Sequence, residues 1–352
     1  MANEGGVLKS LERADLSFCD KASSFLQSDF WGNFKSRFEW EARAFVAEWK
    51  CGEETYEKKP LLVLCRRFIF GFSLAYVPWG PELPFETSHQ SAIKELAFRL
   101  KEMLPKNTVL VRFDLPWTFD GLPEIGKPFI RAAVDVQAPD TVIIDLTQPF
   151  ELLKEQMKPK WRYNAGLALR KGVKVYLAGE EKLDSFYGLL QETARRDGIS
   201  IHSREYYKTI FSLSSSVAQT RQSVRLYLAE HAGDTIAGII TLFRGANAVY
   251  LYGASSNNKR NLMAPYAIQL KAMEDAKEYG CAEYDLYGIP PTEDPNHPMA
   301  GLYRFKTGFG GKIIHRSGCW DFPCKKVLYF AYRYMEKARK KIMLLKKIYS
   351  KH

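Results

Sequence analysis

The pattern of apolar and polar positions along this chain predicts the same succession of elements twice. In the first half, three runs rich in β-branched and aromatic residues predict strands at 44–49, 61–70 and 73–77. Apolar residues at spacings of three and four then predict a helix over 93–104, which Pro105 ends. A further strand, 109–113, runs into Asp114. The first half therefore holds antiparallel strands, a helix, and a strand that ends in an acid.

The second half repeats that order. Its strands are predicted at 223–229, 235–243 and 248–253, followed by a helix over 264–279 that stops at Gly280. A last strand, 282–284, again runs into an acid, Asp285. The repetition indicates an α/β (α+β) protein built by duplication of one unit. We predict a first domain at 1–145, a second at 146–316, and a return of 317–352 to the first domain.

The positive charge of the chain is concentrated at its end. The net charge is +11, and residues 325–351 hold ten Lys or Arg against a single acid, Glu336. Apolar residues recur every three or four positions between these bases, which predicts a basic amphipathic helix. Packing of residues 327–334 on the first domain is the plain alternative for its apolar face. The bases expected to contact RNA phosphates or an anionic membrane surface are Arg339, Lys340, Lys341, Lys346 and Lys347.

Several classes of protein are disfavoured by the sequence. The first residues lack the basic and apolar segments of a secretory signal, so we expect a cytoplasmic protein, with a peripheral place on the inner face of the membrane as an option. The longest apolar stretch, 68–79, is too short to span a bilayer. The six cysteines contain no CxxC pair, so we expect reduced thiols and no metal site. DNA is not an expected partner.

The order of elements resembles the acyl-CoA N-acyltransferase-like (GNAT-like) fold, and predicts two such domains in tandem. Enzymes of that fold hold the pyrophosphate of coenzyme A with a glycine-rich turn whose backbone amides open a helix. The corresponding turns here, 257–264 and 84–90, contain no glycine. We therefore expect no coenzyme A, and no other cofactor.

Six sequence segments, in the same order, resemble the FemABX family of non-ribosomal peptidyltransferases. They are QSDFWGNFK at 27–35, YVPWGP at 76–81, TVIIDL at 141–146 with KWRYN and RKGV after it, YLYGAS at 250–255, YDLYGI at 284–289 and LYRFKTGFGG at 302–311. Where the family usually has a basic residue, this chain has Trp79. Each segment alone is weakly specific, whereas six in order form a specific pattern.

The resemblance implies an activity and its substrates. Members of the family transfer an amino acid from aminoacyl-tRNA, as co-substrate, to the stem-peptide side-chain amine of a muramyl-peptide precursor, either lipid II or UDP-MurNAc-pentapeptide. The product is an interpeptide bridge in peptidoglycan. Some members carry a long helical arm in the second domain, and residues 183–216 are too few for one, so the chain resembles the armless, FemX-like type.

The resemblance also places the reaction centre. It assigns the catalytic pair to Phe305 and Lys306, with the lysine as the residue that matters for the reaction. A fixed ammonium stabilises the negative charge that develops on the ester carbonyl and on the leaving ribose oxygen. Without the resemblance, Lys306 would be read as a solvated lysine on a helix.

Five further residues match family positions that hold the acceptor. Lys35 corresponds to a lysine beside the phosphates or the muramyl end, although a lysine in such a context is ordinarily on the surface. Tyr250 and Tyr252 are predicted to point to one face of their strand, with buried sheet tyrosines as the alternative. The other two are Arg204 and Tyr207, whose spacing departs from the family pattern.

Two acids are candidates for the general base. Asp114 and Asp285 end equivalent strands and are candidate general bases, or else turn residues.

Two other functions remain as alternatives. One is an aminoacyl-tRNA:protein transferase, which uses the same donor on a protein N-terminus. The other is a non-catalytic protein that binds RNA or a membrane surface on the same scaffold.

Overall fold

The computed structural model describes residues 7–84, 89–118, 125–215 and 222–349, without the side chains of residues 69, 215 and 343–349. The chain divides into two compact units. Unit 1 comprises residues 1–139 and 316–352, and unit 2 comprises residues 140–315. The chain thus leaves unit 1 once and returns to it along one strand, β13 (Lys312–Pro323), whose first residues pair within unit 2 and whose later residues pair within unit 1.

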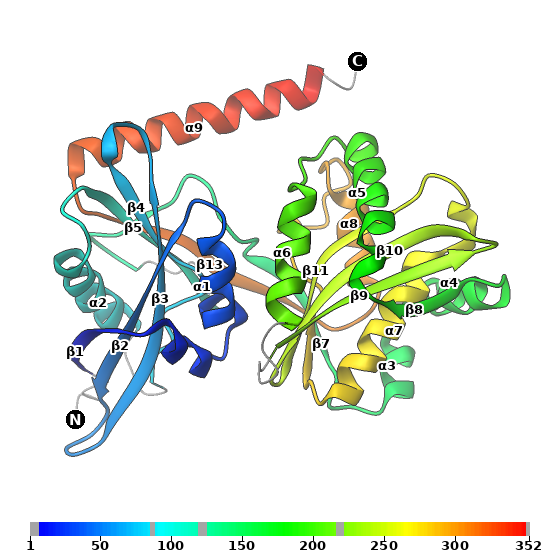
Figure 1. The fold of residues 1–352 in the computed structure, drawn as a ribbon, viewed down its shortest axis with the longest axis horizontal. Coiled ribbons are helices and arrows are strands. Elements are labelled where there is room, and N and C mark those ends of the chain that lie inside the picture. Colours follow the sequence, from blue (N-terminus) through cyan, green and yellow to red (C-terminus); the bar gives the residue numbers. More distant parts are fainter. Residues whose placement is uncertain (1–6, 85–88, 119–124, 216–221, 350–352) are drawn as a thin grey trace. The chain divides into compact units, whose positions relative to one another are not determined.

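Unit 1 is a sheet whose strands run in the order β1-β2-β3-β4-β5-β13, and all neighbours are antiparallel except β4 and β5 (Figure 1). Its other strands are β1 (Val7–Ala14), β2 (Glu41–Lys50), β3 (Tyr56–Arg67), β4 (Ser73–Val77), β5 (Thr108–Thr118) and β6 (Ile130–Arg131). Its helices are α1 (Asp29–Ser36), α2 (His89–Met103) and α9 (Lys326–Tyr349), with short 3-10 turns η1 (Leu16–Lys21), η2 (Phe25–Gln27) and η3 (Ile69–Gly71).

Unit 2 repeats this plan, with strands in the order β8-β9-β10-β11-β12-β7-β13 and one parallel pair, β11 and β12. Its strands are β7 (Asp140–Asp145), β8 (Lys174–Ala178), β9 (Gln222–His231), β10 (Asp234–Arg244), β11 (Asn247–Ser255) and β12 (Glu283–Asp285). Its helices are α3 (Phe150–Gln156), α4 (Pro159–Arg170), α5 (Leu183–Asp197), α6 (Arg204–Ser215), α7 (Ala264–Tyr279) and α8 (Ala300–Thr307), with turns η4 (Glu180–Lys182) and η5 (Arg260–Leu262).

Each unit connects its parallel pair of strands through a helix, α2 in unit 1 and α7 in unit 2, as a parallel connection requires. The apolar face of α2 at Ile93, Leu96 and Leu100 is fully buried against the sheet of unit 1. In unit 2, Ile268 and Ala272 of α7 are buried in the corresponding place. The predicted succession of strands, helix and strand is therefore present in both units.

Three predicted details are wrong. The strand predicted at 61–70 ends at Arg67, because the chain turns at η3. Asp114 does not end its strand, since β5 continues to Thr118 and pairs there with β13. Residues 327–334 of α9 do pack on unit 1, but through Leu328, Tyr329 and Tyr332, so the predicted choice of face is wrong. The apolar positions predicted by spacing, Val327, Ala331 and Tyr334, are exposed.

Candidate active site

Lys306 lies in the last turn of α8 and is buried, with 5% of its surface exposed. Its Nζ donates hydrogen bonds to the backbone carbonyls of Tyr287 at 2.7 Å and Gly288 at 2.9 Å, and lies 5.2 Å from the centre of the Tyr250 ring. Burial lowers the pKa of this ammonium to about 7, while the negative charge of Asp285 acts in the opposite direction. The site therefore contains a lysine whose amino group is fixed in place by backbone oxygens.

The turn that supplies these oxygens is held by Asp285, at the end of β12. The Asp285 carboxylate accepts the backbone N–H of Tyr287 at 2.7 Å and the hydroxyl of Thr141 on β7. Tyr287 has a left-handed backbone (φ 58°), which a residue with a bulky side chain seldom adopts. Asp285 thus holds the turn so that the backbone carbonyls of Tyr287 and Gly288 face Lys306.

The helix that carries Lys306 is itself anchored to α4. The Trp161 indole N–H donates to the carbonyl of Phe305 at 2.8 Å, and the N–H of Lys158 donates to the carbonyl of Gly308 at 2.9 Å. A Cβ on Gly308 would come within 2.1 Å of the Trp161 ring, so only glycine allows this approach. The Phe305 ring is half-buried and packs against Tyr266 of α7 at 5.3 Å.

Tyr250 and Tyr252 point to opposite faces of the sheet, so the prediction that they share a face is wrong. The register between β10 and β11 shifts between these two residues, and the bulge reverses the alternation. Tyr250 packs into the core beneath α7, next to Lys306. Tyr252 instead contacts Tyr207 of α6, with 5.1 Å between ring centres.

Tyr252 belongs to an aromatic cluster on that second face. Its hydroxyl donates to the Tyr206 hydroxyl at 3.3 Å, and the His202 ring stacks on Tyr206 at 3.8 Å. Burial raises the pKa of Tyr252 well above its ordinary value, which keeps the phenol protonated. Arg204 lies apart from the rings, on the surface, in a two-pronged ion pair with Asp184. The structure therefore brings Tyr207 and Tyr252 together and leaves Arg204 outside their cluster.

Lys35 and Asp114 are linked in unit 1 through two aromatic rings. Lys35 Nζ lies 5.9 Å from the Trp40 ring, and Trp40 lies 6.1 Å from Tyr76. The Tyr76 hydroxyl donates to Asp114 at 2.8 Å, and the backbone N–H of Gln137 donates to the same oxygen at 3.0 Å. Burial raises the pKa of Asp114 to about 6, and burial followed by the charge of Arg66 lowers that of Lys35 to about 8.

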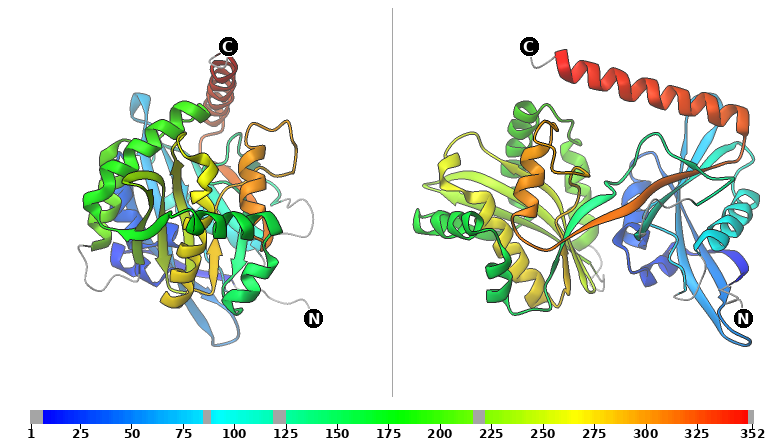
Figure 2. Two further views of the ribbon diagram at one scale, coloured as in Figure 1. Left: turned by 90° about the vertical axis from the view of Figure 1, so that its right-hand side faces the viewer. Right: turned by 180° about the vertical axis from the view of Figure 1, so that it is seen from behind.

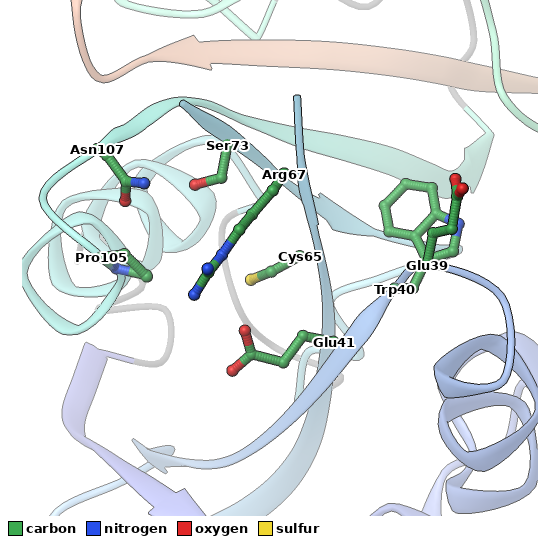
Figure 3. Close-up of a pocket in the computed structure, with 8 residues that line it drawn as sticks. All are labelled: Glu39, Trp40, Glu41, Cys65, Arg67, Ser73, Pro105 and Asn107. Atoms are coloured by element: carbon green, nitrogen blue, oxygen red, sulfur yellow. The ribbon is translucent and has the colours of Figure 1, made fainter. Parts of the chain in front are cut away.

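A pocket of about 550 Å³ lies next to this group in unit 1 (Figure 3). Trp40 forms part of its wall, and the side chains of Glu41 and Arg67 extend into it on either side of Cys65. Burial raises the pKa of the Cys65 thiol to about 11, so this cysteine is protonated and weakly nucleophilic at neutral pH. Trp40 lines the pocket and also contacts Lys35 and Tyr76, so the pocket adjoins the predicted site residues of unit 1.

The family model of the FemAB family matches residues 117–213 and 212–337, which is more than half of the chain. This chain belongs to the FemAB family. A lipid II:glycine glycyltransferase of Staphylococcus saprophyticus is 23% identical over 251 residues, covering 55% of this chain and 60% of the relative. The Staphylococcus aureus enzyme of the same name is 22% identical over 256 residues, with 55% and 61% covered. The chain thus spans about three fifths of the length of these relatives.

Two solved structures confirm the predicted fold of the FemAB chain. The crystal structure of FemX superposes with a TM-score of 0.77 at 18% identity, covering 92% of this chain and 100% of that one. A tandem GNAT protein from the clavulanic acid biosynthesis pathway superposes with a TM-score of 0.52 at 10% identity, covering 90% and 98%. Two tandem GNAT-like domains are therefore the architecture of this member of the FemAB family.

The segment at 27–35, the first of the six that resemble the family, contains the residues that hold the helix of Lys35 in place. Gln27 is buried, and its side-chain amide exchanges hydrogen bonds with the backbone of Leu62 and donates to the carbonyl of Pro78 at 2.6 Å. The hydroxyl of Ser28 accepts the N–H of Trp31 and caps α1, the helix that presents Lys35. These two residues therefore join α1 to the sheet of unit 1.

The predicted basic contacts lie on α9. Arg339, Lys340 and Lys341 are exposed, whereas the side chains of Lys346 and Lys347 lie outside the described residues. Within the described part of the chain, no helix is both long enough and apolar enough to cross a membrane.

Proposed function

We propose that this chain transfers an amino acid from aminoacyl-tRNA to the side-chain amine of the stem peptide in a muramyl-peptide precursor. Membership of the FemAB family supports the proposal, as do relatives named for glycyl transfer to lipid II. The observation that carries it is Lys306, a buried ammonium fixed by two backbone carbonyls at the position that the family resemblance assigns to catalysis.

The reaction exchanges an ester for an amide. The acceptor amine attacks the carbonyl carbon that joins the amino acid to the tRNA, so a C–N bond forms and the C–O bond to the ribose breaks. The amine loses a proton, and the ribose oxygen gains one. Negative charge develops on the carbonyl oxygen and then on the departing oxygen, and stabilising that charge is the main task of the protein.

Lys306 suits this task because its geometry is set before the substrate arrives. An ammonium has three protons, and the carbonyls of Tyr287 and Gly288 accept two of them. The third proton is then available to the developing oxyanion. A donor that needs no rearrangement is worth roughly 3 kcal/mol in the transition state, or about a hundredfold in rate.

Asp285 acts in this proposal as a positioning residue and not as the general base. Its carboxylate is 5% exposed and already binds Thr141 and the N–H of Tyr287, so its role is to hold the turn beneath Lys306. Asp114 is likewise occupied by Tyr76 and Gln137 in unit 1. The proton of the amine then passes to water or to the substrate.

Lys35 and Tyr252 are the predicted residues that serve the acceptor in this proposal. Lys35, half-buried among aromatic rings, supplies a positive charge for phosphate. The Tyr252 hydroxyl donates to Tyr206, so its oxygen remains available to accept a hydrogen bond from the precursor, and the buried Tyr207 supports the Tyr252 ring. Coenzyme A is not a co-substrate in this proposal, because the turn before α7 lacks glycine and carries the side chains of Lys259 and Met263 at its left-handed positions.

The test measures the mass of the acceptor. Purified protein is incubated with a mixture of charged tRNAs and with the pentapeptide precursor in lipid-linked or nucleotide-linked form, and the product is weighed. We expect an increase of one or more amino-acid residues with wild type and with Lys312→Met, an exposed lysine of the same unit, but not with Lys306→Met. An increase on a protein N-terminus instead would support the protein transferase, and no transfer to any acceptor would support the binding scaffold.

A further inference from the structure

The helix α9 has one face that packs on unit 1. It lies across one end of the strands of that unit (Figure 2). Tyr329 is fully buried, and the Tyr332 ring lies 5.8 Å from Phe68, next to the turn between β3 and β4. Arg333 donates to the carbonyl of Arg131 at 2.7 Å. These contacts fix the rotation of the helix about its axis.

The packed face also holds the negative charge of the helix. Glu336, the single acid in the sequence of α9, binds Arg112 through both carboxylate oxygens at 2.7 and 3.0 Å. Arg112 is buried and also binds Asp321 at 2.7 Å. Because this acid is already paired on the inner side, the outer side of α9 carries positive charge alone.

The outer face of α9 is a strip of large apolar side chains. Five residues spaced by one, three, four or seven positions are between 53% and 83% exposed: Val327, Phe330, Tyr334, Met335 and Ile342. Exposed bases lie on or beside this strip: Lys326, Lys337, Arg339 and Lys341. Lys340 is also exposed, but it continues the row of Tyr329, Arg333 and Glu336. Scattered apolar residues on a surface are ordinary, but an apolar strip edged by bases on a single helix face is typical of an interaction site.

An exposed aromatic ring outside α9 lies at the same end of unit 1. Phe70 is 91% exposed and has a left-handed backbone (φ 64°), in the turn between β3 and β4. Its neighbours Phe68 and Phe72 pack in the cluster around Tyr329, so this turn is joined to α9. A bulky side chain held outward in an unfavourable backbone conformation is a further sign of a surface with a partner.

We propose that the outer face of α9, together with Phe70, binds an anionic lipid surface. A helix that lies in the plane of a membrane has an apolar strip to insert between the head groups and bases to pair with their phosphates, which is the arrangement on α9. RNA would use the bases but would leave the strip exposed. A second copy of this chain would cover the strip but would bring like charges together.

This inference does not depend on the proposed chemistry, and its test needs no turnover. Full-length protein is sedimented with vesicles of phosphatidylcholine alone, or with about one third phosphatidylglycerol, a head group that carries the negative charge the bases require. We expect wild type to sediment with the anionic vesicles only. The triple substitution Lys337→Glu, Arg339→Glu and Lys341→Glu should weaken binding at least tenfold, and so should the double substitution Phe330→Ser and Tyr334→Ser.

The matched control makes the same change of charge elsewhere on unit 1. The exposed lysines of and after α2, substituted as Lys94→Glu, Lys101→Glu and Lys106→Glu, should leave binding within about twofold of wild type, since long-range charge alone is screened by salt. Circular dichroism and thermal unfolding establish that each variant is folded. Equal losses in the control and α9 variants, or binding unchanged by the apolar substitutions, would overturn the proposal.

Two other outcomes would assign the face to a different partner. Retention by RNA of wild type but not of the α9 charge variant, with no binding of either to anionic vesicles, would indicate a nucleic-acid surface. A dimer in light scattering that the Phe330→Ser and Tyr334→Ser variant converts to a monomer would indicate self-association. Either result, in the absence of vesicle binding, contradicts the lipid proposal, and neither bears on whether Lys306 supports transfer.

Discussion

Two lysines with lowered pKa values, one in each unit, lie in different surroundings. Lys306 of unit 2 is almost fully buried, and two backbone carbonyls bind its ammonium. Lys35 of unit 1 is only half-buried, and aromatic rings surround it: Trp31 at 5.6 Å, Trp40 at 5.9 Å and Phe34 at 6.0 Å from Nζ. Burial is the main reason for the lowered pKa in both.

The difference separates two uses of the same side chain. Carbonyl oxygens hold Lys306 at one point, as stabilisation of a transition state requires, because the donor must be in place before charge develops. Ring faces attract the Lys35 ammonium without fixing its direction, and its flexible stem can follow a bound anion. We therefore assign the rate of the chemical step to Lys306 and the affinity for the acceptor to Lys35, and each prediction below tests that division.

The largest effect is expected from Lys306→Met. Methionine preserves the volume of the side chain but removes the charge, so the single-turnover rate should fall at least about a hundredfold. Quench-flow with charged tRNA and the muramyl precursor measures this rate, and Lys312→Met serves as the control. A rate within about threefold of wild type would contradict the assignment of Lys306 to the chemical step.

The next effect concerns the turn that holds Lys306. Asp285→Asn weakens the hydrogen bonds to Thr141 and Tyr287, so the carbonyls lose their alignment and kcat should fall about thirtyfold with little change in KM. Thr141→Val, which removes one of the same bonds without touching the carboxylate, should reduce kcat about threefold. If Asp285 were a general base, Asp285→Asn would lower kcat far more than about thirtyfold, because an amide cannot accept the proton of the amine.

The fold was predictable where its determinants are local in sequence. The limits of α7 were predicted as 264–279 from the helical spacing and from Gly280, which ends the helix in a left-handed conformation. The order of strands, helix and strand in each unit was predicted, whereas the parallel pairing that this order brings about is a finding of the structure. The extension of β5 beyond Asp114 was not predictable, because its partner β13 lies about two hundred residues later in the chain.

The site was predictable in part, through the resemblance. It pointed to Lys306, but the carbonyls that bind it belong to a turn whose conformation no residue pattern indicated. The bulge between Tyr250 and Tyr252 depends on pairing with β10, so the prediction from simple alternation that both point to one face was wrong. Tyr206 and His202 were missed, because His202 lies before the start of α6 and no spacing in the sequence indicates that its ring stacks on Tyr206.

A smaller effect is expected from Lys35→Met. Loss of one charge near a phosphate should raise KM for the precursor about tenfold and leave kcat within about twofold, since the charge acts on binding and not on the reacting atoms. Steady-state kinetics over a range of precursor concentrations separate the two constants. Lys101→Met, an exposed lysine on α2 of the same unit, is the control. A fall in kcat with unchanged KM would reverse the division between the two lysines.

The smallest effect is a change with pH that distinguishes the ammonium of Lys306 from its amine. The pKa of Lys306 is about 7, so the charged form is lost as the pH rises through neutrality, whereas an arginine stays charged. The single-turnover rate of wild type divided by that of Lys306→Arg should therefore fall about threefold between about pH 6.5 and about pH 7.5. Taking the ratio removes the titration of the acceptor amine, which is common to both proteins. A ratio that rises over this interval would mean that neutral Lys306 accepts the proton of the amine, and the carbonyls of Tyr287 and Gly288 would then serve to hold a base.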